Sequence, residues 1–258
     1  MSKSGTVLLE KAGGLGIITL ARPDKLNALS SSMRAEFGRH VADVAEDTEV
    51  KVVLLRGEGR AFCAGADLVD APDTPLAWRD RVLIAQSHHL QLARMRKPVI
   101  AAVQGAAVGG GASMALAADI LIMAEDAKLV FPFVRLGLVP DGGMAYLLQA
   151  KLQAAIALDL LLSGGTMSAS EAARLGLTRR VVSVDQLDAA SRALAGDLLR
   201  LPWEALMLTK ALCAQYWATN LQGALSHEAD AFALASSTEG HKRALTTIRQ
   251  KLEKEGLA

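Results

Sequence analysis

Short, uninterrupted apolar stretches alternate with longer amphipathic stretches along the first two thirds of the chain. Residues 51–56 (Lys-Val-Val-Leu-Leu-Arg) are one such run, which is typical of a strand covered on both faces of its sheet. Two further strands are expected on either side of the turn signal Gly13–Gly14. The strands predicted in this way cover residues 7–10, 16–20, 51–56, 99–103, 120–124, 129–133 and 181–182.

Helical spacing of apolar residues predicts helices between and after these strands. Ser30 is a suitable cap for a helix through residue 45, and Ser168 with Glu171 forms a capping box for a later one. Further helices are expected over residues 78–95, up to about 117, over 146–162, and throughout the region beyond 186. This order predicts an α/β core over residues 1–195 and a helical region over 196–258, joined as one continuous domain.

Composition and charge narrow the class of protein. Of the 258 residues, 51% are hydrophobic and 21% are charged, and the net charge is +1, which disfavours nucleic acid as a partner. The chain lacks the apolar run of about 20 residues that a membrane span needs, and residues 1–5 are polar, unlike a secretory leader. Two cysteines, Cys63 and Cys213, have neither disulfide-framework nor metal-ligand spacing. We therefore expect a cytoplasmic enzyme or binding protein without a metal.

Two glycine-bearing loops are the candidate sites of chemistry, because each follows an expected buried strand and precedes an expected helix. They are residues 61–68 (Ala-Phe-Cys-Ala-Gly-Ala-Asp-Leu) and residues 103–113 (Val-Gln-Gly-Ala-Ala-Val-Gly-Gly-Gly-Ala-Ser). Helix N-termini present unpaired N–H groups, and two of them aimed at one point can hold a developing negative oxygen. Either loop taken alone is better explained as a tight turn or as close helix packing. A dinucleotide site is disfavoured, because the glycines at residues 13–16 precede a strand.

Taken together, these loops and their neighbours resemble the enoyl-CoA hydratase/isomerase (crotonase) family. The resemblance extends over roughly residues 6–240 and is carried by motifs that occur in the family's order. These motifs are residues 21–29 (Ala-Arg-Pro-Asp-Lys-Leu-Asn-Ala-Leu), 59–68, 97–111 continuing to 120, 131–143 and, more weakly, 161–182. The resemblance implies a spiral of ββα units and a C-terminal helical trimerisation region, in a homotrimer or hexamer.

The resemblance also implies the binding residues. The backbone N–H groups of Ala66 and Gly110 would form an oxyanion hole for an acyl-coenzyme A thioester, so that coenzyme A is part of the substrate and no separate cofactor is needed. Lys25 would either meet a phosphate or remain solvated. The backbone that cradles the coenzyme A arm would come from Lys25, Ala28, Ala64, Gly65, Asp67 and Leu68. We further expect Asp67 to cap a following helix.

The acid–base residues distinguish the branches of the family. At the two positions where hydratases of the family carry glutamates, this chain has Ser113 and Phe133. The stretch 134–143 instead resembles the isomerase branch, in which an acidic residue directly after a proline shuttles a proton, and Asp141 follows Pro140. The leading hypothesis is therefore an enoyl-CoA isomerase with Asp141 as its base. The alternatives are an enoyl-CoA hydratase and a catalytically silent acyl-CoA-binding protein; outside the family context Asp141 is an ordinary turn residue.

Overall fold

The computed structural model describes residues 6–257, with the side chains of all of these except residues 215–219. The polar stretch 1–5 lies outside the described residues. Within them, six strands form a sheet in the order β1-β2-β3-β4-β6-β9, in which β1 is antiparallel to β2 and the remaining pairs are parallel. These strands are β1 (Thr6–Ala12), β2 (Leu15–Ala21), β3 (Val52–Gly57), β4 (Val99–Val103), β6 (Ile120–Ala124) and β9 (Val181–Val182).

A second sheet, which the sequence pattern did not predict, joins β5 (Ala106–Val108), β7 (Lys128–Val130) and β8 (Thr166–Ser168). Together the sheets repeat a ββα unit, since β4 and β6 in the first sheet lead to β5 and β7 in the second, and helices follow. The expectation of one strand over residues 129–133 was wrong at its end. Pro132 has no N–H for a strand ladder, and Phe133 begins the short 3₁₀ helix η2 (Phe133–Leu136).

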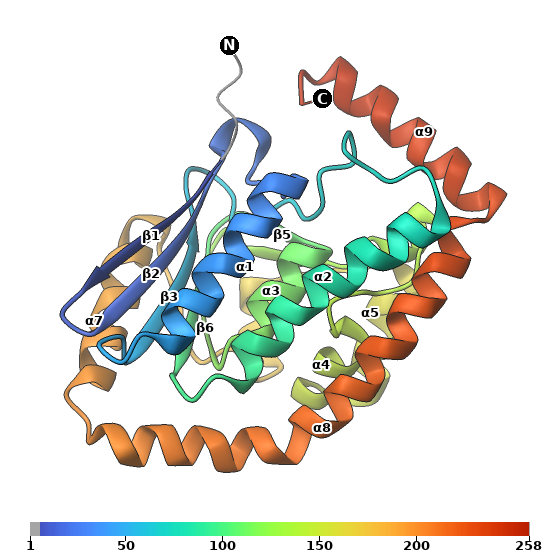
Figure 1. The fold of residues 1–258 in the computed structure, drawn as a ribbon. Coiled ribbons are helices and arrows are strands. Elements are labelled where there is room, and N and C mark those ends of the chain that lie inside the picture. The colour runs from blue at the N-terminus through green and yellow to red at the C-terminus, as the bar shows by residue number, and fades with distance from the viewer. Residues whose placement is uncertain (1–5, 258) are drawn as a thin grey trace.

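Helices cover both faces of the six-stranded sheet (Figure 1). Side chains alternate along β3, so that Val53 and Leu55 pack in one core cluster and Val52 and Leu54 in the other. The first cluster includes side chains of α1 (Ser31–Glu46), α2 (Pro75–Arg94) and α3 (Gly110–Ala117). The second includes α7 (Leu187–Leu199). Burial on both faces is why this strand reads as a continuous apolar run.

The C-terminal third is helical, as expected. In Figure 1, α8 (Trp203–Ser236) runs along the lower edge and up the right side, and α9 (Glu239–Lys254) continues from it. The predicted helix 146–162 is instead two helices, α4 (Met144–Lys151) and α5 (Ala154–Ser163), because Leu152 is extended and lets them pack on each other. The expected boundary at residue 195 falls inside α7.

Three further short helical segments occur in the described chain. The Ser168 side chain accepts a hydrogen bond from the Glu171 N–H at the start of α6 (Ala169–Arg174), which agrees with the predicted cap. Two further 3₁₀ turns are η1 (Pro23–Lys25) and η3 (Val184–Gln186).

Among the helices of the described residues, none combines the length and the apolar character needed to cross a membrane.

Candidate active site

Backbone hydrogen bonds hold the two glycine loops against each other. The Cys63 N–H donates to the carbonyl of Ala106 at 3.1 Å, and the Val108 N–H donates back to the carbonyl of Cys63 at 2.9 Å. Gly65 sits at the contact with a φ of +86°, and a Cβ added there would lie 2.6 Å from the Val108 carbonyl oxygen and 3.6 Å from the Gly110 nitrogen. Only glycine therefore fits this close approach of the loops.

The N–H groups of Ala66 and Gly110 have no hydrogen-bond partner within the described residues. Next to the first, the Asp67 N–H donates to the carbonyl of Leu29 at 3.0 Å, so the neighbouring backbone is already paired. Gly110 is the first residue of α3, where the N–H groups lack acceptors within the helix. Ala66 and Gly110 both line one cavity of about 80 Å³. The two unpaired donors thus border the same cavity.

Asp141 lines the same cavity, from the turn that precedes α4. A Cβ added at Gly110 would lie 4.0 Å from Oδ1 of Asp141, and this oxygen is buried without a hydrogen-bond partner. Burial raises the pKa of Asp141 to about 6, against the opposing effect of Arg34 and Arg81. Among the described residues that line the cavity, Asp141 alone carries a carboxylate. It is therefore suited to take up a proton near neutral pH.

Side chains from two helices fix the turn that carries Asp141. The Ser113 hydroxyl, on α3, donates to the backbone carbonyl of Asp141 at 2.8 Å. On α2, burial and then neighbouring His88 and Arg34 lower the pKa of His89 to about 4, so its neutral ring donates to the carbonyl of Gly142 through Nδ1 at 3.2 Å. Ser113 and His89 therefore position the turn.

Glu228 is a third side chain that positions this turn, and it was not expected from the sequence. Its carboxylate, on α8, accepts hydrogen bonds from the N–H groups of Gly143 at 2.7 Å and Ala145 at 3.1 Å. Burial raises the pKa of Glu228 to about 8, and nearby Asp141 adds to the rise. Its position 85 residues beyond Gly143, inside a long helix, gave no local sequence signal of this contact.

The rest of the cavity is walled by apolar and basic side chains. Phe133 and Leu138 lie in the wall, and of the segment 70–78 only Trp78, on α2, lines the cavity. Helices α1, α2 and α8 supply most of the remainder. The described lining residues from these helices are Arg34, Phe37, Trp78, Arg81, Val82, Ala85, His88, His89 and Phe232.

The residues expected to bind the coenzyme A arm belong to the first glycine loop and to the segment at residues 25–28. Of these residues, Leu68 lines the cavity. The Ala64 N–H donates to the carbonyl of Leu26 at 2.9 Å, which joins the segment that contains Lys25 and Ala28 to the loop. Lys25 Nζ donates to the carbonyl of Gly256 at 3.3 Å, beyond the end of α9. Both expected binding segments are therefore adjacent.

Asp67 has a different local role from the one expected. It caps no helix, because α2 begins only at Pro75. Its carboxylate forms an ion pair with Arg22 at 2.7 Å and accepts from the N–H of Val69 at 3.0 Å. The ion pair therefore joins the first glycine loop, which contains Asp67, to the segment that begins at Arg22.

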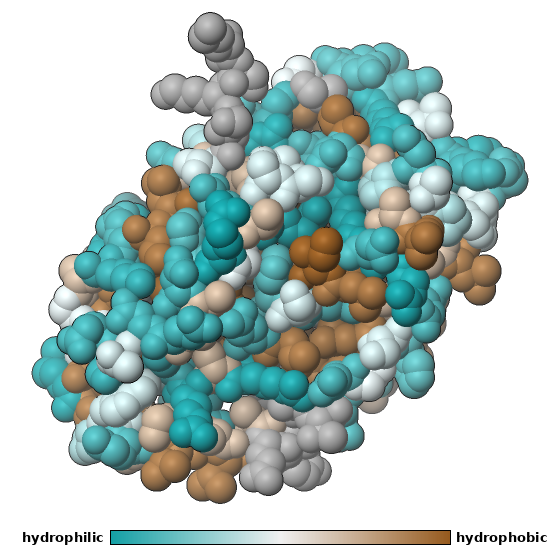
Figure 2. All heavy atoms as spheres, in the orientation of Figure 1, coloured by the Kyte–Doolittle hydropathy of each residue, from teal (hydrophilic) through white to brown (hydrophobic). Residues whose placement is uncertain are grey.

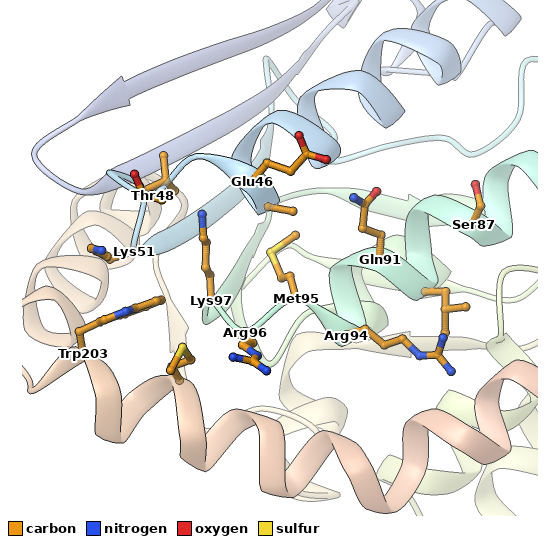
Figure 3. Close-up of a pocket in the computed structure, with 14 residues that line it drawn as sticks. Glu46, Thr48, Lys51, Ser87, Gln91, Arg94, Met95, Arg96, Lys97 and Trp203 are labelled. Atoms are coloured by element: carbon orange, nitrogen blue, oxygen red, sulfur yellow. The ribbon is translucent and has the colours of Figure 1, made fainter.

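A second, larger cavity of about 650 Å³ lies between α1, α2 and the N-terminal half of α8 (Figure 3). It contains none of the expected site residues. Two of its lysines are engaged locally, since Lys97 Nζ donates to the carbonyl of Val44 at 2.5 Å and Lys51 lies 4.9 Å from the centre of the Trp203 ring. Elsewhere in the described chain, no group of three or more His, Cys, Asp or Glu side chains is arranged to hold a metal ion.

Known proteins that are similar to this chain in sequence or in structure come from one family. The sequence profile of a family described as enoyl-CoA hydratase/isomerase matches residues 10–255. A probable enoyl-CoA hydratase of Mycobacterium bovis is 34% identical over 246 residues, which cover 95% of each chain. The 1,2-epoxyphenylacetyl-CoA isomerase of Escherichia coli is 33% identical over 243 residues, covering 92% of this chain and 93% of that one. A crystal structure of an enoyl-CoA hydratase from Mycobacterium avium subsp. paratuberculosis superposes with a TM-score of 0.87 at 30% identity, covering 93% of this chain and 97% of the other.

Proposed function

The chain belongs to the enoyl-CoA hydratase/isomerase family, and we propose that within this family it is an enoyl-CoA isomerase with Asp141 as its base. The observation that carries the proposal is the cavity itself. It is bordered by the unpaired N–H groups of Ala66 and Gly110, and it contains one carboxylate with a raised pKa. An acyl-CoA thioester with its carbonyl oxygen between the two N–H groups would present its α-carbon to Asp141.

In the proposed reaction, Asp141 removes a proton from C2 of a 3-enoyl thioester. The C–H electron pair forms the C1–C2 double bond of an enolate, whose oxygen accepts from Ala66 and Gly110; each such donor can contribute about 2.7–4 kcal/mol. The enolate electrons then form the C2–C3 double bond, and the former C3–C4 π electrons take the proton from Asp141 at C4. No water is added and no cofactor is consumed, because coenzyme A belongs to the substrate.

A hydratase is the alternative, because several relatives bear that name. Adding water across a double bond normally divides the acid and base roles between two groups. Here the hydratase positions hold Phe133, which is apolar, and Ser113, whose hydroxyl is bound to backbone carbonyls. This cavity has one carboxylate among its described lining residues, which favours the one-base reaction.

The products formed from two substrates test the proposal. The enzyme is incubated separately with a 3-enoyl-CoA and a 2-enoyl-CoA of the same chain length, and the products are separated by chromatography. We expect interconversion of the two enoyl thioesters without 3-hydroxyacyl-CoA. Net formation of 3-hydroxyacyl-CoA would support the hydratase instead. Binding without any product would indicate a silent acyl-CoA-binding protein.

We also propose that the chain assembles as a homotrimer or hexamer and acts in the cytoplasm. The N-terminal half of α8 exposes Leu208 and Leu212 by 56% and 71%, and Figure 2 shows apolar side chains along this lower edge. Exposed leucines of this kind favour a protein interface. Light scattering tests the assembly, and cell fractionation tests the location.

A further inference from the structure

Two buried arginines face the cavity that holds Asp141. Arg34 comes from α1 and Arg81 from α2, and they are 7% and 8% exposed. Both line the cavity, which is otherwise largely apolar. A guanidinium removed from water requires compensating partners, and a pocket that served only an alkyl chain would gain nothing from two of them.

The hydrogen-bond acceptors that the described residues supply to these guanidinium groups are backbone carbonyls, and the Arg81 guanidinium also lies over the Trp78 ring, 5.4 Å from its centre. Arg34 Nη2 donates to the carbonyl of Leu29 at 3.1 Å. Arg81 donates to the carbonyls of Asp67, at 3.1 Å, and Asp70. Neither guanidinium forms an ion pair with a carboxylate in the described part of the chain. Each carries five N–H donors, so donors remain on both.

The two arginines also act on each other. After burial, the charge of Arg34 is the largest cause that lowers the pKa of Arg81, to about 10. Burial likewise lowers the pKa of Arg34. Two like charges are therefore held close together in a poorly solvated place, an arrangement that a bound anion would relieve.

The charges of Asp67 and Asp70 raise the pKa values of both arginines, but these carboxylates have other hydrogen-bond partners. The Asp67 carboxylate is bound to Arg22, and the Asp70 carboxylate accepts from the Ser31 N–H at 2.8 Å; neither aspartate lines the cavity. Burial lowers the pKa values of His88 and His89, which keeps both rings neutral at pH 7. The cavity lining thus has two positive charges and, from ionised Asp141, one negative charge. Protonation of Asp141 during turnover would remove the one negative charge from the cavity lining.

We propose that Arg34 and Arg81 bind a carboxylate at the far end of the acyl group, so that the preferred substrate is the coenzyme A monothioester of a short dicarboxylic acid. This inference rests on the proposed acyl-CoA site. Arginine is suited to the task because its planar fork pairs with both oxygens of a carboxylate. The cavity of about 80 Å³ corresponds to the volume of about three waters, which limits the acyl group to a short one.

A simpler role for the arginines would be to stabilise ionised Asp141, whose pKa they lower. The two roles predict different behaviour. Loss of an effect on Asp141 would reduce turnover of every acyl-CoA by the same factor, whatever the end of its acyl chain. Loss of a carboxylate-binding residue would reduce binding and turnover of the dicarboxylic thioester selectively.

The first measurement is made on the unaltered protein and needs no turnover. Glutaryl-CoA and pentanoyl-CoA have acyl chains of five carbons and differ in the terminal carboxylate, and calorimetry gives their dissociation constants. We expect glutaryl-CoA to bind about tenfold to a hundredfold more tightly, as for a hydrogen-bonded charge pair. Equal binding, or tighter binding of pentanoyl-CoA, would overturn the inference and leave the isomerase proposal standing.

The second measurement uses matched variants and reports a ratio within each protein, so that general damage cancels. Arg34→Gln and Arg81→Gln should each lower the glutaryl-to-pentanoyl preference about tenfold. Arg79→Gln is the control, because Arg79 lies on the same helix but is exposed and paired with Asp230 at 2.6 Å. An unchanged preference in both cavity variants would also overturn the inference.

Turnover separates this inference from the proposed reaction. The unaltered protein is compared on 3-hexenedioyl-CoA and 3-hexenoyl-CoA, which again differ only at the distal end. Faster isomerisation of the dicarboxylic substrate is expected. Tight glutaryl-CoA binding with no isomerisation of either substrate would support the carboxylate site and contradict the isomerase. Failure to bind any of these thioesters would contradict both.

Discussion

Replacing Asp141 with asparagine should make the protein less active and, above pH 6, more stable. The folded protein holds the carboxylate at a pKa of about 6 instead of 3.8, chiefly through burial. The folded state therefore binds more protons than the unfolded state between these values, and stability falls as the pH rises through this window. At about 1.4 kcal/mol for each pKa unit, the ionised carboxylate costs about 3 kcal/mol of folding free energy at pH 8.

Asparagine keeps the shape of the side chain and carries no charge, so it removes this cost. The variant should gain up to about 3 kcal/mol over the parent at pH 8 and less than about 1 kcal/mol at pH 4, which lies barely above the unfolded-state pKa of 3.8, so that little of the cost has yet built up. Isomerisation of a 3-enoyl-CoA should fall at least about 100-fold, the low end for loss of a general base. Binding of saturated acyl-CoA should change little, because Ala66 and Gly110 contribute backbone groups.

Denaturant unfolding at the two pH values, at one protein concentration, measures the first effect, and steady-state assays measure the second. Asp159→Asn is the matched control, because Asp159 is exposed on α5 and does not line the cavity. A stability gain that is equal at pH 4 and pH 8 would show that burial of charge is not its origin. An Asp141→Asn variant that isomerises at the parent rate would refute Asp141 as the base.

Three other predictions concern the same site. Activity of the parent should fall about tenfold for each pH unit below about 6, because only ionised Asp141 accepts a proton; a pH series of kcat/KM that stays flat to pH 5 would contradict this. Glu228→Ala should lower kcat and stability more than Glu228→Gln, since it leaves the N–H groups of Gly143 and Ala145 without an acceptor, at about 1–3 kcal/mol each; kinetics and denaturant unfolding compare the pair. Gly65→Ala should destabilise the protein by at least about 1 kcal/mol, because its φ of +86° and the Val108 carbonyl leave no room for a Cβ; equal unfolding midpoints would disprove the requirement for glycine.

Most of the fold could be predicted from local patterns. The strands of the six-stranded sheet are apolar runs of the right length, and their boundaries agree within a few residues with those expected. The small second sheet was missed because β5 and β8 have three residues each, too few to show a period. The break at Leu152 was missed because apolar spacing continues across it while the backbone turns extended.

The sequence by itself determined the order of the larger sheet's strands and of most helices along the chain, the two glycine loops and the position of Asp141 after Pro140. These features depend on local requirements, such as a backbone that only glycine can adopt at Gly65. Tertiary structure alone decided that Glu228 clamps the turn before α4 and that Arg34 and Arg81 share a cavity with Asp141. The physical reason is that burial, pKa and the pairing of charges depend on which distant side chains exclude water around a group, and no local pattern records those neighbours.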